Sequence, residues 1–164
     1  MEEGSDGTNG SPGPLARLAR TQVPFLSAAG LVLLLATASA LALTGALTQP
    51  AGTAGCISDD GSGPCTDGRA LNGAASVAVS PDGKSVYAAS VNNDSVVRFN
   101  RNTTTGAIIQ PAGTAGCISE TGSGPCADGH GLSFAFSVEV SADGKSVYVA
   151  SLLSDAVVRF NRAP

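Results

Sequence analysis

An internal duplication at an offset of 61 residues is the strongest constraint on how this chain folds. The sequence "TGALTQPAGTAGC" at 44–56 recurs as "TGAIIQPAGTAGC" at 105–117. Aligned without a gap, residues 44–103 and 105–164 are identical at 41 of 60 positions. Identity this high indicates two copies of one supersecondary unit, and repeated units of this kind bury their apolar faces against each other. We therefore expect two similar units that pack together.

Each copy reads as a run of short strands joined by tight turns. In "SVAVS" at 76–80 the valines alternate with small residues, which is the period of a strand. Pro81, Asp82 and Gly83 then supply the backbone angles and the hydrogen-bonding side chain of a tight turn. The 21 glycines and 9 prolines of the chain agree with many such turns. Four antiparallel strands are predicted for the first unit, at 76–80, 84–90, 95–101 and 107–113, the last of them interrupted or ended by Pro111.

A four-stranded antiparallel meander repeated in tandem is typical of the blades of a β-propeller. The predicted fold class is therefore all-β, with two four-stranded antiparallel blades of an incomplete propeller after an N-terminal hydrophobic helix. The domain that holds both blades is expected at 43–164, with repeats at about 44–104 and 105–164. The cysteine-bracketed segment falls between the fourth strand of one unit and the first strand of the next. We expect it to be an insertion on one rim of the propeller, outside the sheets.

The strand and turn motif "SPDGKSVYAAS…DSVVRFNR" resembles the repeat of the YVTN-type, lactonase-like β-propeller proteins, which carry an S-P-D-G-K-x-x-Y-V turn motif. Together with "GTAGCIS…GSGPCADG" it is similar to secreted bacterial members of that family. The resemblance covers about 44–164 and implies a seven-bladed ring, some of whose members open sugar lactones. No catalytic motif of the family matches this chain residue by residue, so the resemblance assigns no catalytic residue.

Two blades are fewer than a closed ring needs. In chain order the predicted strands run fourth, first, second, third, and then the same again, whereas closed propellers have about four to eight blades. Unpaired strand edges invite association with another chain. One expectation is that three or four chains assemble into a ring, with the leading fourth strand completing a neighbour. The other is that the chain is a fragment of a longer protein, or a non-functional truncated remnant of one.

The N-terminal part differs in composition from the repeats. Residues 1–22 are predicted to be a disordered leader that ends in a basic region with Arg17 and Arg20. Residues 23–42 are apolar and uncharged with small residues near their end, which is typical of a signal peptide. The alternative is a retained membrane anchor within residues 23–47, because a segment of about 20 apolar residues can span a bilayer. Either version exports the repeats, so the chain is expected to be secreted, or held in the cell envelope or membrane by a single helix.

Four cysteines in an exported chain are expected to form disulfides. They stand in two C-x8-C segments, as Cys56, Cys65, Cys117 and Cys126. Four cysteines allow three connectivities, and pairing within each segment is the simplest because the repeat separates the segments by a whole blade. Zinc is disfavoured because the spacing differs from that of zinc ribbons. A calcium site at Asp59, Asp60 and Asp67 is disfavoured because only the last carboxylate recurs unchanged in the second copy.

Candidate acid–base residues are few. His130 is the only histidine, and Glu139 replaces Ala78 of the first copy, where it could face a central channel. An exposed loop and a solvent-facing strand are the simpler interpretations of these two residues. The net charge of −4 and the lack of a basic run argue against nucleic acid as a partner, and no motif implies a cofactor. We predict a non-catalytic binding module for a protein or glycan ligand, with a lactonase-like hydrolase as the alternative.

Overall fold

The computed structural model describes residues 45–164, so the predicted leader at 1–22 and the hydrophobic segment at 23–42 lie outside the described residues. Within 45–164 the chain is all-β, which confirms the predicted fold class. No helix in that range is long and apolar enough to span a membrane. The strands are β1 (Ile57–Ser58), β2 (Thr66–Asp67), β3 (Ala74–Val79), β4 (Ser85–Ser90), β5 (Ser95–Arg101), β6 (Ile108–Ile109), β7 (Cys117–Ser119), β8 (Ala127–Asp128), β9 (Ala135–Val140), β10 (Ser146–Ser151) and β11 (Ala156–Asn161), with short 3-10 helices η1 (Gly52–Gly55) and η2 (Gly113–Ala115).

The first blade is an antiparallel sheet that begins in the order β3-β4-β5, close to the predicted strands. β3 and β4 are joined by the predicted tight turn, in which Asp82 Oδ1 accepts hydrogen bonds from Ser80 Oγ at 2.6 Å and from the Lys84 amide at 3.1 Å. Gly83 has a φ of 69°, a conformation that a side chain would strain. All residues of β4 are buried, because it is the central strand of a sheet that is covered on both faces.

The fourth strand of the first blade comes in two pieces from the second repeat. β6 pairs with the end of β5, where Ile108 lies opposite Arg101, and β7 pairs with its beginning, where Cys117 lies opposite Val97. Pro111 has no amide to donate to the ladder, and η2 connects the two pieces. The expectation that the cysteine segment lies outside the sheets is therefore wrong for the second copy. Its first residues form the edge strand β7, and β8 adds to that strand in parallel.

The second blade is the antiparallel sheet β9-β10-β11, which repeats β3-β4-β5 at the same offset. Tyr148 lies opposite Arg159, as Tyr87 lies opposite Arg98 in the first blade. This sheet has three strands among residues 45–164, because the segment that corresponds to β6 and β7 is 47–58 at the start of the first repeat. Within it only β1 is a strand, and it pairs only with β2. The outer edge of β11 therefore has no partner strand in the described part of the chain.

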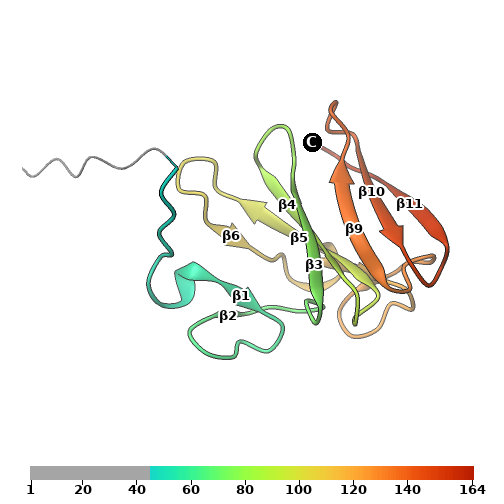
Figure 1. Ribbon diagram of the computed structural model, residues 1–164, viewed down its shortest axis with the longest axis horizontal. Helices are drawn as coiled ribbons and strands as arrows, with labels where there is room; N and C mark the ends of the chain where they lie inside the picture. Colours follow the sequence, from blue (N-terminus) through green and yellow to red (C-terminus); the bar gives the residue numbers. More distant parts are fainter. Residues whose placement is uncertain (1–44) are drawn as a thin grey trace, which may run out of the picture. The chain divides into compact units, whose positions relative to one another are not determined.

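The sheets of the two blades lie side by side (Figure 1), and an apolar cluster joins them. The first blade contributes Val96 and the second contributes Val138 and Val147, all buried. Two backbone amides of the second blade also donate across the interface. The Phe134 amide bonds Asp94 Oδ1 at 2.6 Å, and the Val138 amide bonds a serine of β3 at 3.3 Å. The blades are thus joined by apolar burial and by hydrogen bonds that fix their register.

A second apolar cluster lies on the opposite face of the first blade. It contains Val97 and Phe99 of β5 together with the second disulfide, and Ile57 and Leu71 of the first cysteine segment pack against it. The first cysteine segment therefore covers the first blade in the same way that β7 and its disulfide loop cover the second, since Ile118 packs on the interblade cluster. Within residues 45–164, the outer-strand segment of the first repeat pairs with no blade, because β1 is hydrogen-bonded only to β2.

The disulfides join Cys56 to Cys65 and Cys117 to Cys126, which confirms the pairing within each segment. The two bonds close loops of equal sequence separation, nine residues in each case. Their surroundings differ: Cys117 and Cys126 are 2% and 6% exposed, whereas Cys56 and Cys65 are half-buried. The difference arises because β7 is paired with β5 and β1 has no such partner.

We predict that the second disulfide contributes more stability than the first. Loop entropy is worth about 2–3 kcal/mol for either bond, so a paired replacement by alanine isolates the packing contribution. Cys117→Ala with Cys126→Ala should lower the free energy of unfolding by at least about 1 kcal/mol more than Cys56→Ala with Cys65→Ala, because it also opens a cavity under β5. Urea unfolding of dilute protein measures both losses, and equal losses would contradict the role of β7 in the sheet.

Candidate functional site

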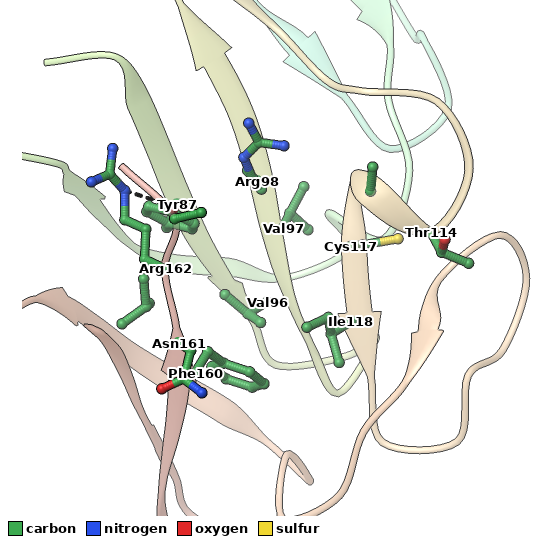
Figure 2. Close-up of a pocket in the computed structure, with 13 residues that line it drawn as sticks. Tyr87, Val96, Val97, Arg98, Thr114, Cys117, Ile118, Phe160, Asn161 and Arg162 are labelled. Atoms are coloured by element: carbon green, nitrogen blue, oxygen red, sulfur yellow. Dashed lines mark hydrogen bonds between the residues drawn. The ribbon is translucent and has the colours of Figure 1, made fainter. Parts of the chain in front are cut away.

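A pocket of about 320 Å³ opens between the two blades (Figure 2). Its walls come from β4 and β5 of the first blade, from η2 and β7, and from the end of the second blade. β11, which contributes Phe160 and Asn161, is the strand whose outer edge has no partner in the described residues. The lining residues are Tyr87, Val96, Val97, Arg98, Thr114, Ala115, Cys117, Ile118, Val147, Phe160, Asn161, Arg162 and Ala163.

Arg162 builds one wall of the pocket and ties the blades together. Its Nη2 donates to both carboxylate oxygens of Asp82, at 2.9 Å and 2.8 Å. Its Nε donates to the Tyr87 hydroxyl at 3.2 Å (Figure 2), and its Nη1 donates to the Gly144 carbonyl at 2.8 Å. The arginine side chain is 4% exposed and that of Asp82 is 25% exposed. Every nitrogen of the guanidinium has a protein partner, so Arg162 holds structure and is not free to bind an anion.

This ion pair changes the acidity of the turn in the first blade. The hydrogen bond from Arg162 holds the pKa of the Asp82 carboxyl well below its ordinary value of 3.8, and hydrogen bonds from Ser80 and the Lys84 amide act in the same direction. Asp143 occupies the same place in the second turn, and hydrogen bonds from Ser141 and the Lys145 amide lower its pKa. Asp143 has no arginine partner within 45–164, so the two turns differ chiefly in the guanidinium.

Arg98 is the second cationic group at the pocket. Its Nη2 donates to Asn100 Oδ1 at 2.7 Å, and it makes no ion pair with any described residue. The side chain is half-buried and projects from β5, on the same face of the blade as Tyr87 and Val96 (Figure 2). The Arg98 guanidinium is therefore the cationic group of the pocket that could form an ion pair with a bound molecule.

The residues that line the pocket include few groups with acid–base or nucleophilic chemistry. Among the described residues that line the pocket there is no carboxylate and no histidine. The sulfur of Cys117 is held in a disulfide, and the Tyr87 hydroxyl accepts the hydrogen bond from Arg162. The rest of the lining is mainly apolar, with Thr114, Asn161 and Arg98 as its other polar residues. Such a surface can contact the side chains of another polypeptide.

The structure does not bring the two candidate acid–base residues together at this site. Glu139 is exposed on β9, opposite Tyr148, on the face of the second blade that points away from the first. His130 is exposed in the loop between β8 and β9. Neither lines the pocket, and no hydrogen bond connects them within 45–164.

The carboxylates of the cysteine segments bind backbone amides. Asp59 Oδ1 accepts from the Leu71 amide at 2.7 Å, and Glu120 accepts from the Leu132 amide at the corresponding place. Hydrogen bonds from Ser62 lower the pKa of Asp60. No cluster of three or more histidine, cysteine, aspartate or glutamate residues is placed to hold a metal ion in the part of the chain that the structure describes. These carboxylates position the loops that follow them.

Reasoning from the sequence missed Arg162 and assigned Asp82 only to the turn. The two residues are separated by 80 positions, and no local pattern connects them. The repeat could have indicated this pair. The aspartate of the turn recurs as Asp143, and the arginine at the end of the third strand occurs in both copies, as Arg101 and Arg162. A polar pair that is duplicated together indicates a contact between neighbouring units.

Comparison with known proteins does not place the chain in a family. No family model and no curated protein matches it. Among solved structures, the chain is similar to hydrazine synthase of Kuenenia stuttgartiensis, with 25% identity over 46% of this chain and a TM-score of 0.29. The matched region spans 16% of that chain. A TM-score this low carries no argument about fold or function.

The lowered pKa of Asp82 predicts how stability depends on pH. A carboxyl that is more acidic in the folded state than in the unfolded state stabilises the fold above its ordinary pKa of 3.8. That contribution is lost as the pH falls through the lowered pKa of the folded protein. The difference in unfolding free energy between the native chain and Asp82→Asn should therefore be constant from about pH 7 to pH 5 and shrink below about pH 4.

Asp143→Asn is the matched control for this measurement. It removes a carboxylate from the corresponding turn, which has Ala142 in place of Pro81 and lacks the guanidinium, so its effect on dilute protein should be smaller throughout. Urea unfolding at a series of pH values gives both curves. Curves of equal height for the two variants would show that the ion pair with Arg162 adds nothing to the fold.

Proposed function

We propose that this chain is an exported, non-catalytic interaction module that binds another protein through the outer faces and edges of its blades. Two disulfides in a chain with no free cysteine among residues 45–164 support an oxidising compartment outside the cytoplasm. A secretory or anchoring segment at 23–42 would deliver the repeats there. The proposed location is outside the cell or in its envelope.

The observation that carries this proposal is the exposure of large apolar side chains on both outward-facing surfaces. On the first blade, Val77 and Val79 are 67% and 54% exposed. On the second blade, Tyr148 and Val157 are 39% and 73% exposed, and strand pairing places both on one face of the sheet. Exposed apolar patches on a soluble domain mark sites of association.

A protein partner fits these surfaces better than a glycan. Val77 and Val79 lie on β3 and Val157 lies on β11, and each of these strands forms an edge of its sheet within residues 45–164. Unpaired sheet edges bind further strands by backbone hydrogen bonds. A lactonase-like activity would need an acid, a base and a site to hold the lactone. Glu139 and His130 are the available starting points and no hydrogen bond joins them within 45–164. A non-functional remnant would fail to fold, which the unfolding measurements above also test.

We predict that the cysteines are oxidised in the chain as its host makes it. The full chain should fractionate outside the cytoplasm and should react with a thiol-specific reagent only after reduction. Cys56→Ser is the matched control, because it leaves Cys65 without a partner and should add one reactive thiol. Free thiols in the native chain, recovered from the cytoplasmic fraction, would contradict the proposed compartment.

We also predict that the purified full chain does not open sugar lactones. The measurement is the release of acid from a panel of aldonolactones at neutral pH, with the spontaneous rate as the baseline. Turnover above that baseline, lost in Glu139→Gln or His130→Ala, would replace the proposed binding function with the hydrolase. Specific binding of a sugar polymer that survives Val157→Lys would favour a glycan ligand over a protein.

A further inference from the structure

We propose that the partner of these surfaces is a second copy of this chain, and that residues 47–58 of one copy form a fourth strand on β11 of the next, whose outer edge is unpaired within residues 45–164. This inference rests on the proposed interaction function and names its partner. The partner is identified by the internal repeat, which shows the same contact made once within the chain.

The template is the pairing of β5 with β6 and β7. In that pairing Val97 lies opposite Cys117, Val96 opposite Ile118 and Ser95 opposite Ser119. Moved by the offset of the repeat, the same register sets Val158, Val157 and Ala156 of β11 opposite Cys56, Ile57 and Ser58. Both members of the pairing are thus present twice, whereas the pairing is made once within 45–164.

The incoming segment already has the conformation it needs. Residues 49–58 and 110–119 have the same sequence, "QPAGTAGCIS". In the first copy the Gln49 side chain donates to the Gly55 carbonyl at 3.2 Å, and in the second Gln110 donates to the Gly116 carbonyl at 3.3 Å. A 3-10 turn follows the proline in both. A segment that is preorganised in this way loses little conformational entropy on binding.

The apolar residues left exposed are those that the template buries. Val77 and Val79 are 67% and 54% exposed, whereas their counterparts in the second repeat, Val138 and Val140, are 3% and 7% exposed at the interface between the blades. Repeating that interface between copies would cover the outer face of the first blade. Two valines on one strand are thereby removed from water.

The complementary face belongs to the second blade. Tyr148 and Val157 are 39% and 73% exposed, whereas Tyr87 and Val96 in the first repeat are 8% and 6% exposed. The two exposed faces therefore correspond to the two halves of one existing interface. The corresponding pair of faces is already in contact between the two blades of one chain.

Polar groups are also ready on both sides. Arg101 Nη1 donates to the Gly83 carbonyl at 3.0 Å, as Arg162 Nη1 does to the Gly144 carbonyl at 2.8 Å. In the proposed contact, Arg101 would pair with Asp143 of the neighbouring copy, as Arg162 pairs with Asp82. Ser141 and the Lys145 amide donate hydrogen bonds to Asp143 in its turn. The ion pair that joins the two blades can therefore form again between Arg101 of one copy and Asp143 of the next.

Glu139 is the main departure from the template on this face. It takes the place of Ala78 and lies opposite Tyr148 in the sheet, as Ala78 lies opposite Tyr87. In the template, the Tyr87 hydroxyl accepts a hydrogen bond from Arg162. Arg101 of the neighbouring copy would contact Tyr148 in the same way, and the carboxylate of Glu139 would then lie near it. An acidic group at that position is compatible with the proposed contact and adds attraction to it.

The contact is head to tail, since the surfaces that meet are different. Such contacts repeat until the rotation closes a ring. Closed propellers have about four to eight blades, so a ring in which each copy contributes the two described blades would contain about two to four copies.

The first test is the mass of the purified full chain. Sedimentation over a range of concentrations should give a discrete assembly at a multiple of the chain mass, which is 16.1 kDa before any cleavage. Asp143→Arg and Arg101→Asp should each weaken association by at least about tenfold, because each places like charges across the proposed interface.

Mixing the two variants tests the geometry itself. In a ring of two or four copies in which Asp143→Arg and Arg101→Asp chains alternate, every interface again pairs opposite charges, so the mixture should regain the native mass although neither variant does so alone. The double variant Asp143→Arg with Arg101→Asp should also regain it. Lys145→Glu is the control for a charge change beside the turn, and it should have a much smaller effect on the assembly.

A folded chain that stays monomeric at high concentration would overturn this inference and leave the interaction function standing, with an unrelated protein as the partner. An assembly whose mass is unchanged by both charge reversals, or that is not regained by the double variant, would also overturn it, and so would failure of the mixture to recover a native assembly of two or four copies. The interaction function itself would fail on different measurements, namely reduced cytoplasmic cysteines or lactone turnover.

Discussion

Pairing of β5 with β6 and β7 crosses the boundary between the repeats, and the rest of the structure depends on it. A strand at the edge of a sheet leaves a row of backbone amides and carbonyls without partners. Residues of the second repeat supply those partners to the first blade, and so the second cysteine segment becomes part of a sheet. From there the chain continues into β9, which places the second blade against the first. One set of backbone hydrogen bonds thereby completes a blade and positions its neighbour.

Much of this arrangement could be predicted from the sequence, because it is recorded locally. Alternation of valine with small residues located β3, and the turn residues Pro81 to Gly83 located the hairpin. The spacing of the cysteines indicated their pairing. The role of Cys117–Ser119 as a strand could not be found in this way, since three residues carry no period and Pro111 interrupts the run before them. The contact between Arg162 and Asp82 could not be predicted for a related reason. The two residues are 80 positions apart, and the turn already accounted for Asp82.

Whether an apolar residue of the repeat is buried depends on whether another blade packs against it, and not on the repeat sequence alone. Val77 and Val138 occupy the same position of the same motif, yet one is 67% exposed and the other 3%. The same holds for the disulfides, one half-buried and one in the core. Hydrophobic patterning therefore identifies the residues that can be buried, and the number of blades present decides which of them are. This is why the candidate interface could be described only after the pairing of the strands was known.

The separation between Asp82 and Arg162 has a consequence for how the protein matures. Contacts distant along the chain form late, since the intervening segment must first be ordered. The disulfides close over nine residues and can form as soon as each loop reaches an oxidising compartment, whereas the ion pair spans 80 residues and must wait for both blades. During folding, the face of the first blade that contacts Arg162 is therefore expected to be among the last surfaces to be covered.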